Sequence, residues 1–142
     1  MADICDSFDT TRRIYILYID DDPDLLIIWK KILEKTNYFW VDVALSADEG
    51  LRKMDEDRYD CIISDYQMPK MDGVQLLQFI REKNETIPVI LFTLHHHVKN
   101  KIEGLNYPSI YFLEKKTDTQ TQVASIIRII MTALGNDSGL RK

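Results

Sequence analysis

The sequence predicts an α/β fold in which helices cover both faces of a parallel sheet. Short runs of β-branched and aromatic residues alternate with longer amphipathic segments, which is typical of strand and helix units in succession. Most of the short runs are apolar at every position, as expected for strands that are buried on both faces. The 142 residues fit one domain of ordinary size, so a single sheet is the simplest architecture.

Five apolar runs are the expected strands, and they occupy residues 14–19, 40–45, 61–64, 89–92 and 109–113. Between them, the helices carry start signals of their own. Asp22 before Pro23 is a favourable cap and first residue of a helix, and Ser46 with Glu49 has the form of a capping box. The remaining helices are expected from Gly73, over residues 97–105 and over residues 118–134.

The strand and helix pairs fill residues 13–134 without a linker or an internal repeat. We expect this segment to be the folded domain. Residues 1–12 and 135–142 are polar, and we expect them to be an N-terminal extension and a C-terminal tail.

Composition argues against several classes of protein. The net charge is −5 and no Lys/Arg run exceeds two residues, so direct nucleic-acid binding is not expected. The only two cysteines, Cys5 and Cys61, form neither a disulfide framework nor a metal-ligand spacing. No apolar run approaches the about 18 residues of a membrane span, which predicts a cytoplasmic protein. The charge clusters Lys30–Lys31 and Asp55–Asp57 are interpreted as solvated faces.

Apolar residues at helical spacing on the last helix predict its core face, namely Val123, Ile126, Ile127, Ile130 and Leu134. This assignment leaves Ile129 pointing away from the core. Ile129 is then either a single exposed apolar side chain or part of a partner surface. The second interpretation predicts a homodimer through the last strand and helices.

Three consecutive carboxylates, Asp20 to Asp22, close the first expected strand. Asp22 is accounted for as a helix cap, whereas Asp20 and Asp21 place two like charges at one edge of a sheet. A cation relieves such repulsion, and Mg²⁺ prefers oxygen ligands. We therefore expect Asp20 and Asp21 to hold Mg²⁺, or Mn²⁺ in its place.

Other strands end in groups that suit the same chemistry, because ligands of open parallel sheets bind at the carboxyl ends of the strands. Asp65 ends the third strand, Thr93 the fourth, and Lys115 follows the fifth. A carboxylate such as Asp65 can attack phosphorus and form an acyl phosphate. Thr93 can donate a hydrogen bond to a phosphoryl oxygen and Lys115 can neutralise its charge. Phosphoryl transfer to Asp65 is the predicted reaction.

Four motifs in this order resemble the receiver domain of two-component response regulators. They are Ile-Asp-Asp-Asp-Pro at 19–23, Asp-Cys-Ile-Ile-Ser-Asp-Tyr-Gln-Met-Pro-Lys-Met-Asp-Gly at 60–73, Pro-Val-Ile-Leu-Phe-Thr at 88–93 and Tyr-Phe-Leu-Glu-Lys at 111–115. The resemblance covers nearly the whole chain, and the segment around Asp65 is the most specific part. It implies a doubly wound, flavodoxin-like sheet of five parallel strands in the order 2-1-3-4-5.

The resemblance also implies a function and a set of roles. Asp65 would accept a phosphoryl group from a histidine kinase or a phosphotransfer protein in a Mg²⁺-dependent reaction, and the domain would shift between inactive and active conformations. Such a chain is a signalling receiver and not an enzyme acting on external substrates. Asp21 and Asp65 would bind the metal directly, Asp20 through water, and the Gln67 backbone carbonyl would be a further ligand. Phe112 would rotate inward when Thr93 moves toward the phosphate.

Some positions depart from the family pattern or modulate it. Leu94 occupies a place where the family usually has a small residue, so it is expected to crowd the site and slow the labelling of Asp65 by small phosphodonors. Gln67 and His95 match positions that tune the hydrolysis of the acyl phosphate. Consecutive histidines at 95–97 point in different directions, so we do not interpret them as a metal site.

Two alternative functions stay open at the level of the sequence. A Mg²⁺-dependent aspartyl-phosphate hydrolase would carry an acid two residues after its nucleophile, and Gln67 at that place disfavours it. Leu94 motivates the other alternative, a pseudo-receiver that binds partners without using phosphate.

Overall fold

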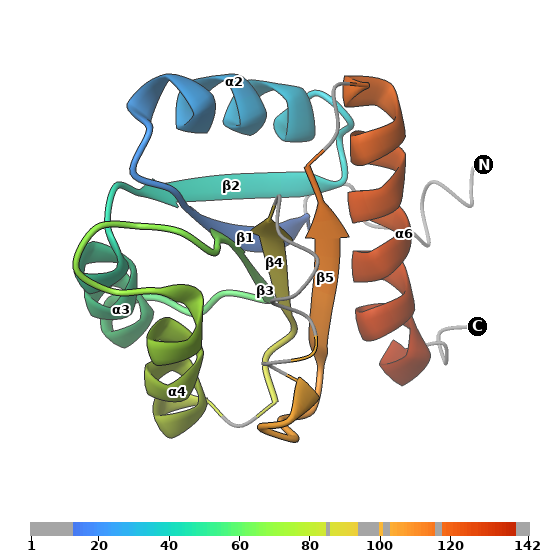
Figure 1. The fold of residues 1–142 in the computed structure, drawn as a ribbon. Coiled ribbons are helices and arrows are strands. Elements are labelled where there is room, and N and C mark those ends of the chain that lie inside the picture. The colour runs from blue at the N-terminus through green and yellow to red at the C-terminus, as the bar shows by residue number, and fades with distance from the viewer. Residues whose placement is uncertain (1–12, 85, 94–99, 101–102, 116–117, 139–142) are drawn as a thin grey trace.

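The computed structural model describes residues 13–84, 86–93, 100, 103–115 and 118–138. Its centre is one sheet of parallel strands, β1 (Ile14–Ile19), β2 (Phe39–Ala44), β3 (Cys61–Asp65), β4 (Val89–Thr93) and β5 (Ile110–Glu114) (Figure 1). The strand order is β2-β1-β3-β4-β5. The predicted fold class and the order implied by the family resemblance are both confirmed.

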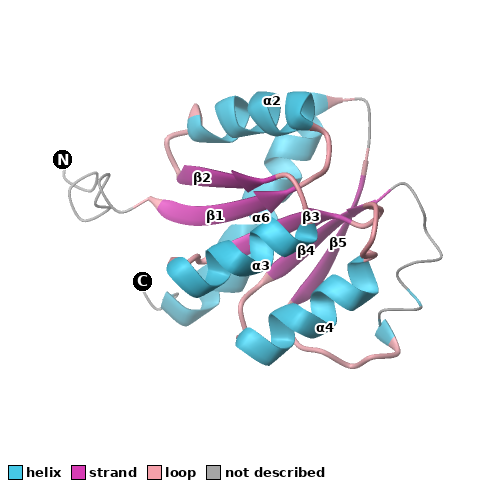
Figure 2. Cartoon of the chain, turned by 90° about the vertical axis from the view of Figure 1, so that its left-hand side faces the viewer, coloured by secondary structure: helices cyan, strands magenta, loops and turns pink. Residues whose placement is uncertain are grey.

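Helices cover both faces of this sheet, which is why most positions of its strands are apolar. The helices α3 (Ala47–Glu56) and α4 (Gly73–Lys83) lie side by side on one face, as Figure 2 shows. The helices α2 (Pro23–Glu34) and α6 (Thr119–Ser138) pack on the other. The first face buries Leu17, Ile62, Leu76, Leu77 and Ile80, and the second buries Ile16, Ile63, Leu26, Leu33 and Ile126. Within the described ranges, no helix combines the length and hydropathy that a membrane crossing requires.

The strands begin and end within one residue of their predicted bounds, and local contacts explain the shifts. Leu45 was expected in the second strand, but its N–H donates to the Glu49 carboxylate at 2.6 Å and the residue lies outside β2. Ser109 was expected in the fifth strand, but its φ of 57° is left-handed. A strand cannot include that conformation, so β5 begins at Ile110.

The capping signals are confirmed with one difference. The Ser46 side chain accepts a hydrogen bond from the Glu49 N–H at 3.1 Å, as a cap should. Glu49, however, binds the N–H of Leu45 and not that of Ser46, so the box is displaced by one residue. A reciprocal capping box occurs instead at the start of α4, between Asp72 and Gln75.

The last helix is longer than predicted and its core face is wider, because Ile129 joins the predicted core residues Ile126, Ile127, Ile130 and Leu134. Helix α6 ends at Ser138 and not at Leu134. The prediction that Ile129 points away from the core is wrong, because Ile129 is half-buried against the α2/α6 cluster. Buried Gln122, which donates to the Glu114 carbonyl at 3.0 Å, lies on the same side of the helix as Ile129. This polar contact widens the core face beyond the apolar stripe.

The helix expected over residues 97–105 lies largely outside the described residues. The dimer prediction stays untested, although it has lost the exposed Ile129 on which it depended.

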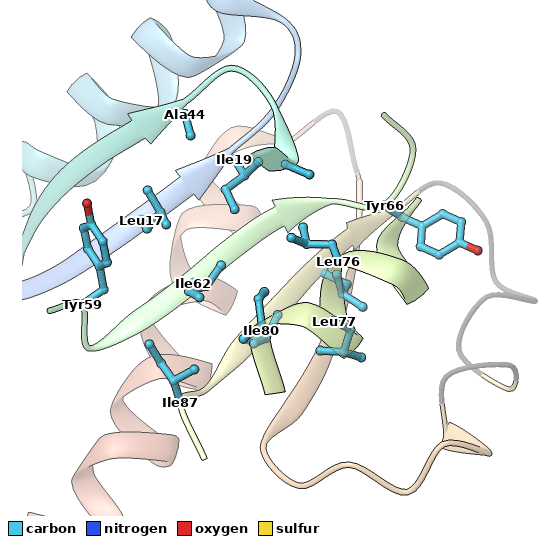
Figure 3. Packing of buried hydrophobic residues seen from close by; sticks show 13 residues of the cluster. Leu17, Ile19, Ala44, Tyr59, Ile62, Tyr66, Leu76, Leu77, Ile80 and Ile87 are labelled. Carbon is cyan, nitrogen blue, oxygen red and sulfur yellow. The ribbon is translucent and has the colours of Figure 1, made fainter. Parts of the chain in front are cut away.

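Gly73 is the position where packing most restricts substitution. Figure 3 shows the α3/α4 side of the core, in which Tyr66 lies beside the start of α4. A Cβ atom on Gly73 would overlap the Tyr66 ring. We expect Gly73→Ala to lower the free energy of unfolding by about 1–3 kcal/mol, as overpacking does. Urea denaturation measures this loss.

Gly50→Ala is the matched control for this prediction. A Cβ atom there would lie 2.6 Å from Cδ1 of Ile19, the far end of a flexible side chain. Alanine also gains about 1 kcal/mol of helix propensity over glycine. A loss at Gly73 no larger than that at Gly50 would contradict the overlap with Tyr66.

Candidate functional site

The register of neighbouring strands brings three carboxylates together. Asp20 and Asp21 follow β1 and Asp65 ends β3, and these strands pair with Ile19 opposite Ser64. One carboxylate oxygen of each acid lies within 4.8 Å of the others. This confirms the expectation that the acids at the strand ends share one edge of the sheet. The three carboxylates are close enough together to hold one metal ion.

Lys115 and Thr93 lie at the same edge. Strands β4 and β5 end in register, and the Lys115 N–H donates to the Thr93 carbonyl at 3.0 Å. From there the Lys115 side chain reaches the carboxylate of Asp65, with Nζ 3.2 Å from Oδ1. Thr93 is buried. The structure thus places these two residues and the three acids at neighbouring strand ends, as predicted.

Among the acids that the structure describes, Asp20 has the most perturbed ionisation. Its residue is 3% exposed, and burial raises the pKa of its carboxyl to about 6, with the nearby charge of Asp65 adding to the shift. A hydrogen bond from the Asp22 N–H at 3.1 Å and the charge of Lys115 oppose the shift. The site therefore destabilises its own buried negative charge.

The loop after Asp65 is held close to the acidic group. The Gln67 N–H donates to Oδ1 of Asp65 at 3.4 Å, and the Gly73 N–H donates to the Tyr66 carbonyl at 2.8 Å. Lys70 lies in this loop with a left-handed φ of 73°. An open hollow of about 480 Å³ lies along the loop after Asp65 and is lined by Tyr66, Gln67, Met68, Pro69 and Asp72.

The other predicted site residues have different outcomes. Phe112 is half-buried against the α3/α4 side of the core. Leu94 and His95 lie outside the described residues. The roles of Phe112, His95 and Leu94, and the metal contact of the Gln67 carbonyl, stay predictions.

Two tyrosines at the site were assigned no role from the sequence. Tyr66 follows Asp65 directly and packs its ring over Gly73. Burial raises the pKa of Tyr18 well above its usual value, and the charges of Asp20 and Asp65 add to this shift. The available signal for Tyr18 was its position two residues before Asp20, in a strand whose other residues apart from Tyr15 are aliphatic.

Comparison with known proteins gives a consistent result. The family model for the response regulator receiver domain matches residues 16–127. The transcriptional regulatory protein GlrR of Escherichia coli is 35% identical over 107 residues, which is 75% of this chain and 24% of GlrR. ResD of Bacillus subtilis is 35% identical over 68% of this chain and 39% of its own length. The chain thus spans less than half the length of these two relatives.

Solved structures agree on the fold. A receiver domain protein from Clostridium thermocellum has a TM-score of 0.75 and 28% identity, covering 89% of this chain and 98% of its own. The receiver domain of a sensor histidine kinase from Pseudomonas aeruginosa has a TM-score of 0.71 and 21% identity, covering 87% and 99%. That structure contains a magnesium ion in its active site cleft.

The raised pKa of Asp20 has a measurable effect on folding. Between the usual aspartate pKa of 3.8 and the folded value of about 6, the folded state binds a proton that the unfolded state lacks. The stability of the metal-free protein should therefore gain from this group as the pH falls through that range. We expect Asp20→Asn to stabilise the protein at pH 7 by up to about 3 kcal/mol. The gain should shrink toward pH 4, as measured by urea denaturation at a series of pH values.

Asp48→Asn provides the control, because Asp48 is exposed on α3 and outside the acidic group. Its effect should not show the same pH window. An Asp20→Asn protein that is less stable than the native protein at pH 7 would contradict the electrostatic account of this site.

Proposed function

Because the chain belongs to the response regulator receiver domain family, we propose that Asp65 accepts a phosphoryl group from a histidine kinase or a phosphotransfer protein. The observation that carries this proposal is the meeting of Asp20, Asp21 and Asp65 at one sheet edge, with Lys115 on the Asp65 carboxylate. These groups suit a carboxylate that must receive a negatively charged phosphoryl group. The chain is a signalling domain.

The transfer exchanges one bond for another. A carboxylate oxygen of Asp65 attacks the phosphorus of a phosphohistidine, so a P–O bond forms and the P–N bond breaks. The electron pair of the broken bond stays on the imidazole, which takes a proton from water. Lys115 changes partner in this step, from the free carboxylate to the oxygens of the acyl phosphate.

The acidic group fits a hard divalent cation, Mg²⁺ or Mn²⁺. Three carboxylates within 4.8 Å supply the oxygen ligands that such ions prefer. Asp20, Asp21, Asp65 and the Gln67 carbonyl would hold the ion, which when bound neutralises charge on the phosphoryl oxygens. The magnesium ion in the Pseudomonas receiver domain supports this assignment.

Phosphorylation would change the domain through Thr93 and β5. An acyl phosphate brings about −1.5 to −2 charges to an edge where Thr93 and Lys115 are already joined through the backbone. We propose that Thr93 moves to bind the phosphoryl oxygens and that Phe112 follows it. Gln67 and His95 would set the lifetime of the acyl phosphate, and Leu94 would slow access by small phosphodonors.

The donor protein would contact the exposed face of α2. Leu25, Ile27 and Ile28 are 36%, 54% and 49% exposed on the helix that begins directly after Asp20, Asp21 and Asp22. Apolar side chains beside a charged cleft suit a protein partner more than a small molecule. This surface would position the phosphohistidine over Asp65.

The acceptor role is tested by intact-mass analysis after incubation with Mg²⁺ and a phosphorylated histidine kinase or phosphotransfer protein. We expect the native chain and Asp48→Asn to gain the mass of one phosphoryl group. Asp65→Asn should gain none, because an amide cannot form the acyl phosphate, and chelation of the metal should abolish labelling of the native chain. A folded native protein that no donor labels would favour the phosphate-independent pseudo-receiver.

The α2 contact is tested by comparing two kinds of donor. We expect Leu25→Ser with Ile28→Ser to slow phosphotransfer from the protein donor by about tenfold, the effect of losing about 1.4 kcal/mol of apolar contact. Labelling by a small phosphodonor should not change. Phe79→Ser on α4, where Phe79 is 44% exposed, is the matched control. An equal loss with both donors would show that α2 acts through the site and not through docking.

A further inference from the structure

Among the described strands, β2 lies at one edge of the sheet and pairs with β1 alone. On its inner side, the carbonyls of Tyr38 and Ala44 accept hydrogen bonds from Ile14 and from Asp20. The alternation of a strand then turns the backbone groups of the intervening residues, Phe39, Val41 and Val43, outward. Unpaired N–H and C=O groups at such an edge are a template for another strand.

An ion pair on α2 occupies the outward groups of Val41. Lys30 and Glu34 are one helical turn apart, with 2.8 Å between Nζ and Oε2. The Glu34 carboxylate accepts the Val41 N–H at 2.9 Å, and the Lys30 ammonium donates to the Val41 carbonyl. One acceptor and one donor therefore meet the strand, as a neighbouring peptide group would.

A second ion pair does the same at Val43. Asp42 and Lys53 lie 3.0 Å apart between Oδ1 and Nζ. The Asp42 carboxylate accepts the Val43 N–H at 2.9 Å, and Lys53 of α3 donates to the Val43 carbonyl at 2.7 Å. The Tyr59 hydroxyl donates to the other Asp42 oxygen at 2.6 Å and fixes the carboxylate.

Both carboxylates are kept ionised for this task. Burial alone would raise the pKa of Asp42, but hydrogen bonds from Tyr59 and Lys53 outweigh it and hold the pKa below its usual value. At Glu34, burial likewise opposes the hydrogen bond from Lys30, and the pKa is again lowered. Arg13 adds a further donor, which reaches the Phe39 carbonyl at 3.3 Å.

We propose that the ion pairs Lys30–Glu34 and Asp42–Lys53 take the place of a sixth strand and close the β2 edge to strand addition by a second copy of this chain. The flanking residues explain why such closure is needed. Trp40 and Tyr38 are 48% and 39% exposed, and aromatic residues favour strand pairing. An open β2 would thus combine free backbone groups with exposed aromatic rings. This closure is independent of the proposed phosphoacceptor function.

Amide hydrogen exchange of single variants tests the closure. In the native protein the amides of Val41 and Val43 should exchange slowly, although they lie on the outer side of an edge strand. Glu34→Ala should speed exchange about tenfold at Val41 and leave Val43 protected, since the loss of one charge-assisted hydrogen bond is local. Asp42→Ala should have the reverse pattern.

The control is Asp55→Ala, which breaks the exposed Lys83–Asp55 pair of 2.7 Å between α4 and α3. This substitution should change the exchange rate of neither the Val41 nor the Val43 amide. Rapid exchange of both valines in the native protein, or equal acceleration of both by either single variant, would overturn the proposal.

Sedimentation velocity then tests self-association. A variant with alanine at Lys30, Glu34, Asp42 and Lys53 should form dimers as its concentration rises, with a shift of Trp40 emission to shorter wavelengths in a Trp29→Phe background. The Trp29→Phe protein with the four charged residues intact should show no such shift in Trp40 emission. The role of the ion pairs would be refuted if this fourfold variant is folded and stays monomeric while the amides of Val41 and Val43 exchange rapidly. The single variants keep the proposal falsifiable if this variant does not fold.

Discussion

The repulsion among Asp20, Asp21 and Asp65 is the constraint on which the functional edge of this protein depends. The strand register forces the acids together, because Ile19 lies opposite Ser64 and each of these two residues is followed by an aspartate. Burial then makes ionised Asp20 costly, as its raised pKa shows. Lys115 relieves part of this charge from β5. Apolar burial on both faces of the sheet stabilises the fold and offsets the unfavourable free energy of this acidic site.

Much of this edge is predictable from the sequence for a geometric reason. Parallel strands place their carboxyl ends together, so the residues that end apolar runs can be collected without knowing any contact. That rule brings Asp20, Asp65, Thr93 and Lys115 to one place. The order of the strands is different, because no periodicity encodes which runs are neighbours. It followed only from the family resemblance.

Contacts between distant segments were not predictable in the same way. Gln122 is polar, and nothing in its neighbourhood indicates that it is buried against the Glu114 carbonyl. The apolar pattern therefore misplaced Ile129. Lys30 was interpreted as part of a solvated face, yet it donates to the Val41 carbonyl of β2. These two contacts join residues that are eight or more positions apart, and local sequence patterns do not indicate contacts over that separation.

The same chemical groups thus have opposite uses at two edges of one sheet. At the β2 edge each carboxylate lies within 3.0 Å of an ammonium group, so the pairs are neutral and their hydrogen bonds are directed at the backbone. At the carboxyl edge, three carboxylates lie within 4.8 Å of one another, and one ammonium group, that of Lys115, pairs with Asp65. Charge that is balanced internally attracts no ligand, whereas an excess of negative charge favours a cation. The balance of charge, and not the number of charged residues, therefore distinguishes a closed edge from a binding site in this fold.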